Sequence, residues 1–337
     1  MTVLGVLWFI LIFVLIIGYF VLDGFDLGAG VLYPFVAKSD ADKMRVLHAI
    51  GPVWDGNEVW LLTAGGALFA AFAPAYATVF SGFYLAIMLV LFGLILRAVS
   101  IEFRAHGNDM AKLWDVLFFI GSLLPALLLG VAMGNILQGL QLNDAGDYTG
   151  GFFALLNPFA LLCGVLGLVH MLTQGASWLA LKAPEGSDLR KNAVAMRKVL
   201  CLADIALFVV AAIAFNFVVV PYLPYPVCNV AVAGACAVLF AVVMVAQFVM
   251  CKDAEPARDL WGVLLASLGC VFMVCVFAFT VFPNLVPAIT STASITVATA
   301  ASSEATLGAM TIIACIGVPI VLVYHVLVYR AFRGRVK

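Results

Sequence analysis

Charged residues are scarce in this sequence. Of its 337 residues only 10% are charged, whereas 65% are hydrophobic, and the mean hydropathy is +1.17. Soluble domains carry about 25% charged residues, so this composition excludes a soluble enzyme and a disordered chain. A nucleic-acid-binding module is excluded too, because it needs a basic face and the net charge here is -1. The chain is therefore predicted to be an integral membrane protein.

Residues that bind metals are also few. The chain has four histidines and eight cysteines and no CxxC pair, so neither a zinc nor an iron–sulfur site is expected. Only Cys228 lies near the predicted outer face, so no disulfide framework follows. Only His170 and His325 are deep enough for haem ligation, and a hydrogen bond to a neighbour is the simpler role for each. No cofactor and no metal are expected to be bound by this chain.

Nine apolar stretches long enough to cross a bilayer follow one another along the chain. A hydrocarbon core of about 30 Å needs about 20 apolar residues per helix. The predicted spans are 3–35, 48–72, 76–99, 114–140, 152–181, 199–220, 229–250, 260–282 and 305–328. No linker or soluble domain separates them, so residues 1–337 are predicted to form a single all-α transmembrane domain.

The basic residues indicate the orientation of these spans. Cytoplasmic loops carry an excess of Lys and Arg, and here all 17 lie in alternate loops, after spans 1, 3, 5 and 7, and in the C-terminal tail. The other loops contain none. Nine helices with the N-terminus outside and the C-terminus in the cytoplasm satisfy this pattern without exception. The first span has no positive region before it and is too long for a signal peptide, so it is expected to be retained.

Two pairs of acidic residues occupy apolar spans. Asp23 and Asp26 are three residues apart and share a helix face, and Asp55 and Glu58 repeat that spacing in the next span. No Lys or Arg lies within either span, so desolvation and like-charge repulsion favour the protonated form of some of these carboxyls. Together with His48 and Asn57, they are what a proton path from the cytoplasm requires.

A simpler role for the four acids is also open. The carboxyls can be protonated and join helices through hydrogen bonds. Alternatively, they can bind a cation without conducting protons. Asp115 and Asp204 lie closer to the inner ends of their spans and are expected to reach toward the interface.

Several motifs resemble subunit II of cytochrome bd quinol oxidase. The main one is GPVWDGNEVWL at 51–61, followed by TAGGALFAAF at 63–72. Supporting motifs are DGFDLG at 23–28, FSGFY at 80–84, GN at 134–135, QG at 138–139, LNPF at 156–159 and TQGA at 173–176. They cover most of the first half of the chain, whereas the second half is similar in pattern more than in motif.

The resemblance implies both a fold and a partner. The fold is two four-helix bundles, about 1–140 and 152–282, plus a peripheral helix at about 305–328, in a prokaryotic cytoplasmic membrane. The partner is a larger subunit I, which carries the haem b and haem d groups and the quinol-oxidising loop, while subunit II carries no haem. The enzyme oxidises quinol from the membrane pool and reduces oxygen to water with cytoplasmic protons. Some members hold a structural quinone or lipid in subunit II, and a small single-span accessory subunit is left open.

The resemblance also implies roles for individual residues. Asp26 and Asp55 match family acids assigned to a proton route toward the oxygen-reducing haem, and Asp23 and Glu58 lie beside them. Two alternatives stay open at this point. A stand-alone proton-coupled secondary transporter would suit paired intramembrane acids, although no clear inverted repeat is present. A purely structural scaffold would use the same acids only to hold helices together.

Overall fold

The protein is described by a computed structural model that covers residues 1–106, 110–223, 227, 229–251, 253, 255–289 and 294–336. Cys228 lies outside the described residues. The helices are α1 (Val3–Val36), α2 (Asp40–Ile50), α3 (Trp54–Ala71), α4 (Ala73–Gly82), α5 (Tyr84–His106), α6 (Ala111–Gln138), η1 (Phe152–Leu156), α7 (Pro158–Lys182), α8 (Asp188–Ala214), η2 (Phe215–Val219), η3 (Val220–Tyr222), α9 (Val230–Cys251), η4 (Pro256–Arg258), α10 (Asp259–Val281), α11 (Val297–Ala300) and α12 (Glu304–Ala331).

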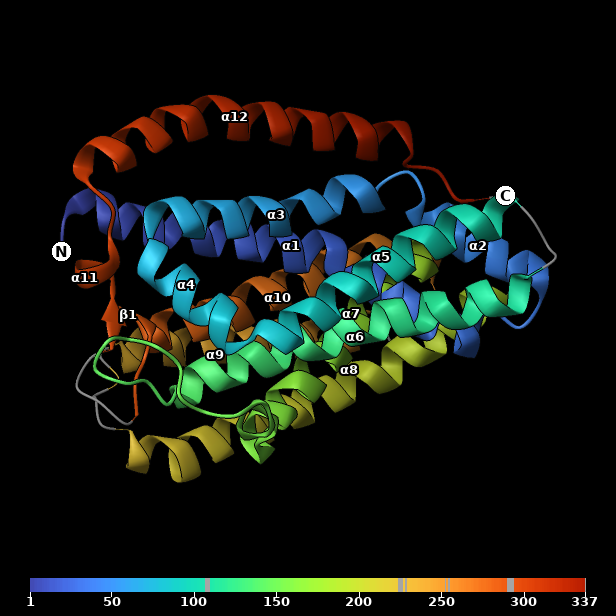
Figure 1. Cartoon of the computed structure of the whole chain (residues 1–337). Helices are drawn as coiled ribbons and strands as arrows, with labels where there is room; N and C mark the ends of the chain where they lie inside the picture. Colours follow the sequence, from blue (N-terminus) through green and yellow to red (C-terminus); the bar gives the residue numbers. More distant parts are fainter. Residues whose placement is uncertain are drawn as a thin grey trace.

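The predicted all-α membrane architecture is confirmed. Eight described helices, among them α1, are long and apolar enough to cross a bilayer. The polar first turns of α3 lower its hydropathy, but its 18 residues span about 27 Å and it lies alongside α1 (Figure 1). With α3 the crossing helices agree with the nine spans expected.

Several predicted span boundaries were wrong. Residues 48–72 do not form one helix, because the chain turns at 51–53 between α2 and α3. Pro52 has no backbone N–H to continue the hydrogen bonding of α2. Residues 76–99 are also divided. Pro74 in the first turn begins α4, which links α3 to α5 (Figure 1), and the crossing helix α5 begins only at Tyr84.

The long helices begin at polar caps and pack through small residues. The side chains of Asn157 and Ser187 accept backbone N–H groups at the starts of α7 and α8. Helices α1 and α7 touch backbone to backbone. A Cβ atom on Gly28 would lie only 1.8 Å from the Met171 carbonyl oxygen, so only glycine fits at that crossing.

The helix α12 lies at the edge of the molecule, along α3 and α1 (Figure 1). Most of its apolar side chains are exposed, as expected for a peripheral helix. Side-chain hydrogen bonds attach it to the bundle along its length. Trp8 donates to the Leu307 carbonyl and the Thr311 hydroxyl, Trp60 donates to His325, and Tyr329 donates to Asn57.

The two ends of the molecule differ in chemistry. At one end, which we call the basic end, ion pairs join Lys43 and Arg104 to Asp115, and Arg335 to Glu185. At the opposite end the loops after α6 and α10 pack together. There β1 (Asn284–Val286) pairs with β2 (Ile295–Thr296), and Leu140 bonds to Pro287 and Ile289. The basic end therefore collects the cationic loops that the charge pattern assigned to one side.

Candidate functional site

The acids on α1 are fully buried. Asp23 and Asp26 both have an exposed fraction of 0%, in the half of α1 nearer the basic end. The first turns of α3 lie beside them and contribute Asn57, also 0% exposed, and Glu58, whose side chain is 21% exposed. The structure therefore brings together four of the six residues predicted for a proton path.

A buried arginine neutralises part of this cluster. The guanidinium of Arg97 lies 2.7 Å from Asp23 Oδ1 and 3.0 Å from Glu58 Oε2, and its side chain is 0% exposed. The sequence interpretation placed Arg97 in the loop after the third span and left the acids without a counter-ion. That was wrong, because α5 continues to His106 and holds Arg97 within the bundle.

The carboxylate of Asp26 is connected to the peripheral helix. The amide of Asn57 donates from Nδ2 to Asp26 Oδ2 over 2.8 Å and to the Leu22 carbonyl over 3.1 Å. Its Oδ1 accepts the Tyr329 hydroxyl over 2.9 Å. Asn57 therefore links a buried acid on α1 to a tyrosine on α12, and both ends of its amide are used.

Two predicted residues lie outside the buried cluster. Asp55 is exposed in the first turn of α3, and no ion pair joins it to the residues that the structure describes. His48 is exposed on α2 and lines a cavity next to Tyr329. Both lie at the basic end, so they are surface groups near the cluster rather than members of it.

Arg97 and Tyr329 were missed as site residues. A signal for Arg97 was present, since it follows an apolar run that begins at Tyr84 and is itself followed by Ala98 and Val99. Tyr329 had no signal in the sequence, because it is more than 270 positions from Asn57, its hydrogen-bond partner.

A buried histidine–carboxylate pair joins α7 and α8. His170 Nδ1 lies 2.7 Å from Asp204 Oδ2, and the two residues are 1% and 0% exposed. The expectation that Asp204 reaches the interface was wrong, because α8 begins at Asp188 and places Asp204 four turns inside the helix. His170 also lines an apolar cavity of about 290 Å³ together with Phe20, Phe208 and Met273.

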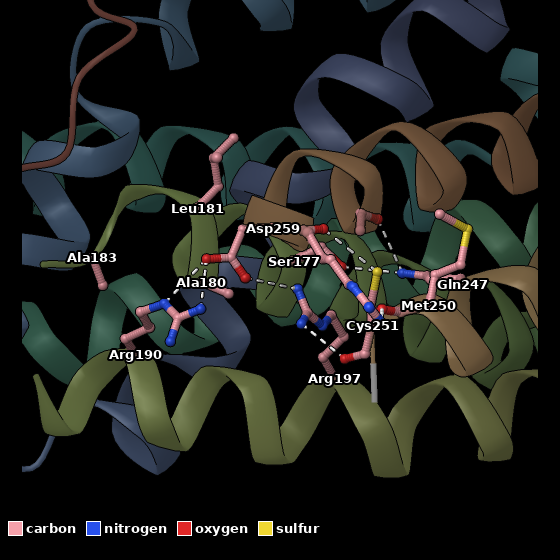
Figure 2. Close-up of polar contacts among 12 residues, drawn as sticks. Ser177, Ala180, Leu181, Ala183, Arg190, Arg197, Gln247, Met250, Cys251 and Asp259 are labelled. Atoms are coloured by element: carbon pink, nitrogen blue, oxygen red, sulfur yellow. Dashed lines mark hydrogen bonds and ion pairs between the residues drawn. The ribbon is translucent and has the colours of Figure 1, made fainter. Parts of the chain in front are cut away.

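A third cluster closes the basic end of α7, α8 and α10. The buried carboxylate of Asp259 accepts Arg190 at 2.8 Å and Arg197 at 3.4 Å (Figure 2). Arg335 of the C-terminal tail approaches the same carboxylate at 3.4 Å and donates to three carbonyls at the end of α7. Because Arg335 donates to carbonyls at the end of α7 and Arg197 to the Cys251 carbonyl at the end of α9, the cluster holds helix ends together.

The Asp23 cluster differs from the Asp259 cluster in its charge balance. Among the described residues, Arg97 contacts Asp23 and Glu58 and lies near the third carboxyl, Asp26, whereas three guanidiniums contact Asp259. A buried group of acids in excess over cations can gain a proton to balance its charge. Chemically, the Asp23 cluster can therefore take up and release protons.

Comparisons with known proteins agree with this arrangement. A model of the family described as cytochrome bd terminal oxidase subunit II matches residues 4–332. Cytochrome bd-I ubiquinol oxidase subunit 2 of Escherichia coli K12 is 37% identical, over 99% of this chain and 95% of the relative. Cytochrome bd ubiquinol oxidase subunit 2 of Bacillus subtilis 168 is 31% identical, over 98% and 96%.

Solved structures share the fold. A chain of the bd oxidase from Geobacillus thermodenitrificans superposes with a TM-score of 0.81 at 15% identity, over 98% of this chain and 99% of that one. The interpretation as a stand-alone transporter is not favoured by these similarities. The chain belongs to the family of cytochrome bd terminal oxidase subunit II.

Proposed function

We propose that this chain is the haem-free subunit of a quinol oxidase and supplies part of the path by which cytoplasmic protons reach the oxygen-reducing haem. In this proposal a larger subunit I carries haem b and haem d, and it oxidises quinol from the membrane pool and reduces oxygen to water. The observation that carries the proposal is the position of the buried acids Asp23 and Asp26 near the basic end, where Arg97 pairs with Asp23 and with the partly exposed Glu58.

Protons would enter this cluster from the basic end. Asp55 is exposed one helical turn before Glu58, which is partly exposed and touches Arg97. A proton taken up at Asp55 would pass to Glu58 and then to the buried acids of α1. His48 and Asn57 would support this route from the surface and from within the cluster.

The setting of the chain is part of the same proposal. The chain would lie in the prokaryotic cytoplasmic membrane. Its N-terminus would be outside, and its basic end and C-terminus would be in the cytoplasm. The chain would form one membrane domain with bundles at about 1–140 and 152–282 and a peripheral helix at about 305–328. It would contact subunit I and lipids, and in some complexes a small single-span accessory subunit.

The apolar cavity beside His170 supports a structural quinone or lipid in this chain. Its volume of about 290 Å³ is near the lower end of known ligand pockets. His170 lines this cavity, and its ring nitrogen Nε2 could form a hydrogen bond with a polar group of such a ligand. Such a ligand would fill the space between α6, α7, α8, α9 and α10.

Neutralising Asp26 in the intact oxidase tests the proton role. We expect the complex carrying Asp26→Asn to consume oxygen at least about tenfold more slowly, because its carboxyl can no longer exchange a proton. The reduced-minus-oxidised haem spectrum and the subunit content should stay as in the unaltered complex. Asp188→Asn is the matched control, since Asp188 is exposed and pairs only with Lys191 among the described residues.

Two outcomes would contradict the proposal. Unchanged turnover of the Asp26→Asn complex would exclude a proton role for this carboxyl. Loss of haem and of subunit I in proportion to turnover would instead favour the purely structural role of the acids.

A further inference from the structure

A second cavity lies at the basic end, beneath the C-terminal tail. It measures about 250 Å³ and is lined by residues of α2, the α2–α3 turn, the end of α7, the end of α12 and the tail. Polar lining residues are His48, Lys182, Tyr329 and Arg335. A cavity of this volume and polarity has room for several water molecules. The exposed side chain of His48 connects it to the surface.

The tail forms a fixed wall of this cavity. Lys182 Nζ donates to the carbonyls of Phe332 and Gly334, and the Val336 N–H donates to the Lys182 carbonyl at 2.8 Å. Arg335 is held by carbonyls at the end of α7 and by Asp259 and Glu185. The cations of the wall therefore have partners of their own, and they hold the tail in place.

Tyr329 forms the inner wall of the cavity. Its hydroxyl donates to Asn57 Oδ1 at 2.9 Å, and Asn57 Nδ2 donates to Asp26 Oδ2 at 2.8 Å. The other oxygen of Asp26, Oδ1, has no hydrogen-bond partner among the described residues. The Tyr329 side chain thus lines the cavity on one side and contacts Asn57, the hydrogen-bond partner of Asp26, on the other.

We propose that this cavity is a cytoplasmic entrance for protons and that Tyr329 is the relay residue between its water and Asp26. This inference rests on the proposed function and adds an entrance separate from Asp55. In the relay step the Tyr329 hydroxyl turns from Asn57 to the unpaired oxygen of Asp26 and gives its proton to the carboxylate. The phenol oxygen takes a proton from a hydronium ion in the cavity, which leaves water, a neutral tyrosine and a protonated Asp26.

The role of Asn57 in this step is positional. Its amide cannot carry an extra proton at neutral pH, but it holds both Tyr329 and Asp26 through one planar group. The Tyr329 ring packs edge-on against Trp178 with centroids 5.9 Å apart. A phenylalanine at position 329 would keep this packing and remove only the hydroxyl.

Two substitutions test the entrance in the intact oxidase. Tyr329→Phe removes the relay hydroxyl, and Gly334→Trp fills the cavity from the tail, where a new Cβ atom would meet no atom within 4 Å. Both are measured in the Asp55→Asn complex, in which the other entrance is closed. We expect each to slow oxygen consumption on the order of tenfold further, with an increased solvent deuterium isotope effect and unchanged haem spectra.

Matched controls lie next to each position. Tyr324→Phe removes a hydroxyl from an exposed tyrosine of α12, and Arg333→Trp adds the same indole at an exposed tail position that does not line the cavity. Neither control should change turnover. If Tyr329→Phe prevents assembly of the complex, Gly334→Trp decides the question.

The possible outcomes distinguish a failure of this inference from a failure of the proposed function. Unchanged turnover of both test variants, in a complex that Asp26→Asn slows, overturns the entrance and leaves the proton role of Asp26 standing. Complete loss of turnover on Asp55→Asn alone also overturns it, because a second entrance would leave residual activity. Unchanged turnover on Asp26→Asn removes the proposed function and this inference together.

Discussion

Arg97 Nη1 lies 2.7 Å from Asp23 Oδ1, and both side chains are completely buried. The two residues come from α5 and α1, more than 70 positions apart in the sequence. The attraction between a buried guanidinium and a carboxylate in contact offsets part of the cost of removing both from water, whereas either group alone would be very unfavourable in the apolar bundle. This pair therefore lets the neighbouring acids occupy a position where water is excluded.

Removing the guanidinium should destabilise the complex. We expect Arg97→Met to reduce the free energy of unfolding by roughly 3–5 kcal/mol, because Asp23 and Glu58 lose their only described cation. The midpoint of thermal unfolding of the purified complex measures this. Lys191→Met, at an exposed pair with Asp188, should cost less than about 1 kcal/mol.

Further substitutions test whether the unpaired carboxyls cause the loss of stability. Adding Asp23→Asn and Glu58→Gln to Arg97→Met removes the unpaired charges, so part of the lost stability should return. If the complex carrying only Arg97→Met is as stable as the unaltered complex, the buried pair of Arg97 and Asp23 does not stabilise the fold.

Asp55 should affect turnover without affecting assembly. Because it is exposed and has no described ion pair, Asp55→Asn removes no packing or charge partner from the fold. We expect oxygen consumption by this complex to fall severalfold while haem spectra and the unfolding midpoint stay constant. A parallel fall in assembled complex would indicate that Asp55 contacts another subunit for structural reasons.

The His170–Asp204 pair gives a test of the second bundle. Either His170→Leu or Asp204→Leu leaves one buried polar group without its partner and should cost roughly 3–5 kcal/mol of stability. The double variant should be more stable than either single variant, because no unpaired group remains. Thermal unfolding of the three complexes measures this coupling, and simple additivity would contradict it.

The C-terminal tail should loosen when Arg335 is replaced. Arg335→Gln removes a guanidinium that contacts carbonyls of Ala180, Leu181 and Ala183, as well as Asp259. We expect chymotrypsin to cleave the chain faster after the exposed Phe332, and mass spectrometry of the fragments over time measures the cleavage rate. Arg333→Gln, at an exposed position, should be cut at the original rate. Equal rates for the two variants would show that the tail is held in another way.

Most of the membrane architecture could be predicted from the sequence. Apolar runs longer than about 20 residues and the alternation of basic loops gave the number and order of the crossing helices. These signals are local, since each span must be apolar by itself. Boundaries failed where a polar helix joins a span, as at α2 and in the first turns of α8, because hydropathy does not mark the end of a helix.

The sequence by itself determined which acids are unusual, because a carboxyl within an apolar run is costly wherever its helix packs. Asp23, Asp26 and Glu58 could be identified in this way. Only the tertiary structure decided their partners. Arg97 and Asn57 reach the acids from α5 and α3, and Tyr329 of α12 reaches Asn57. Asp204 of α8 meets His170 of α7. The charge balance and connections of a buried site depend on contacts between distant segments, which the packing of the helices creates.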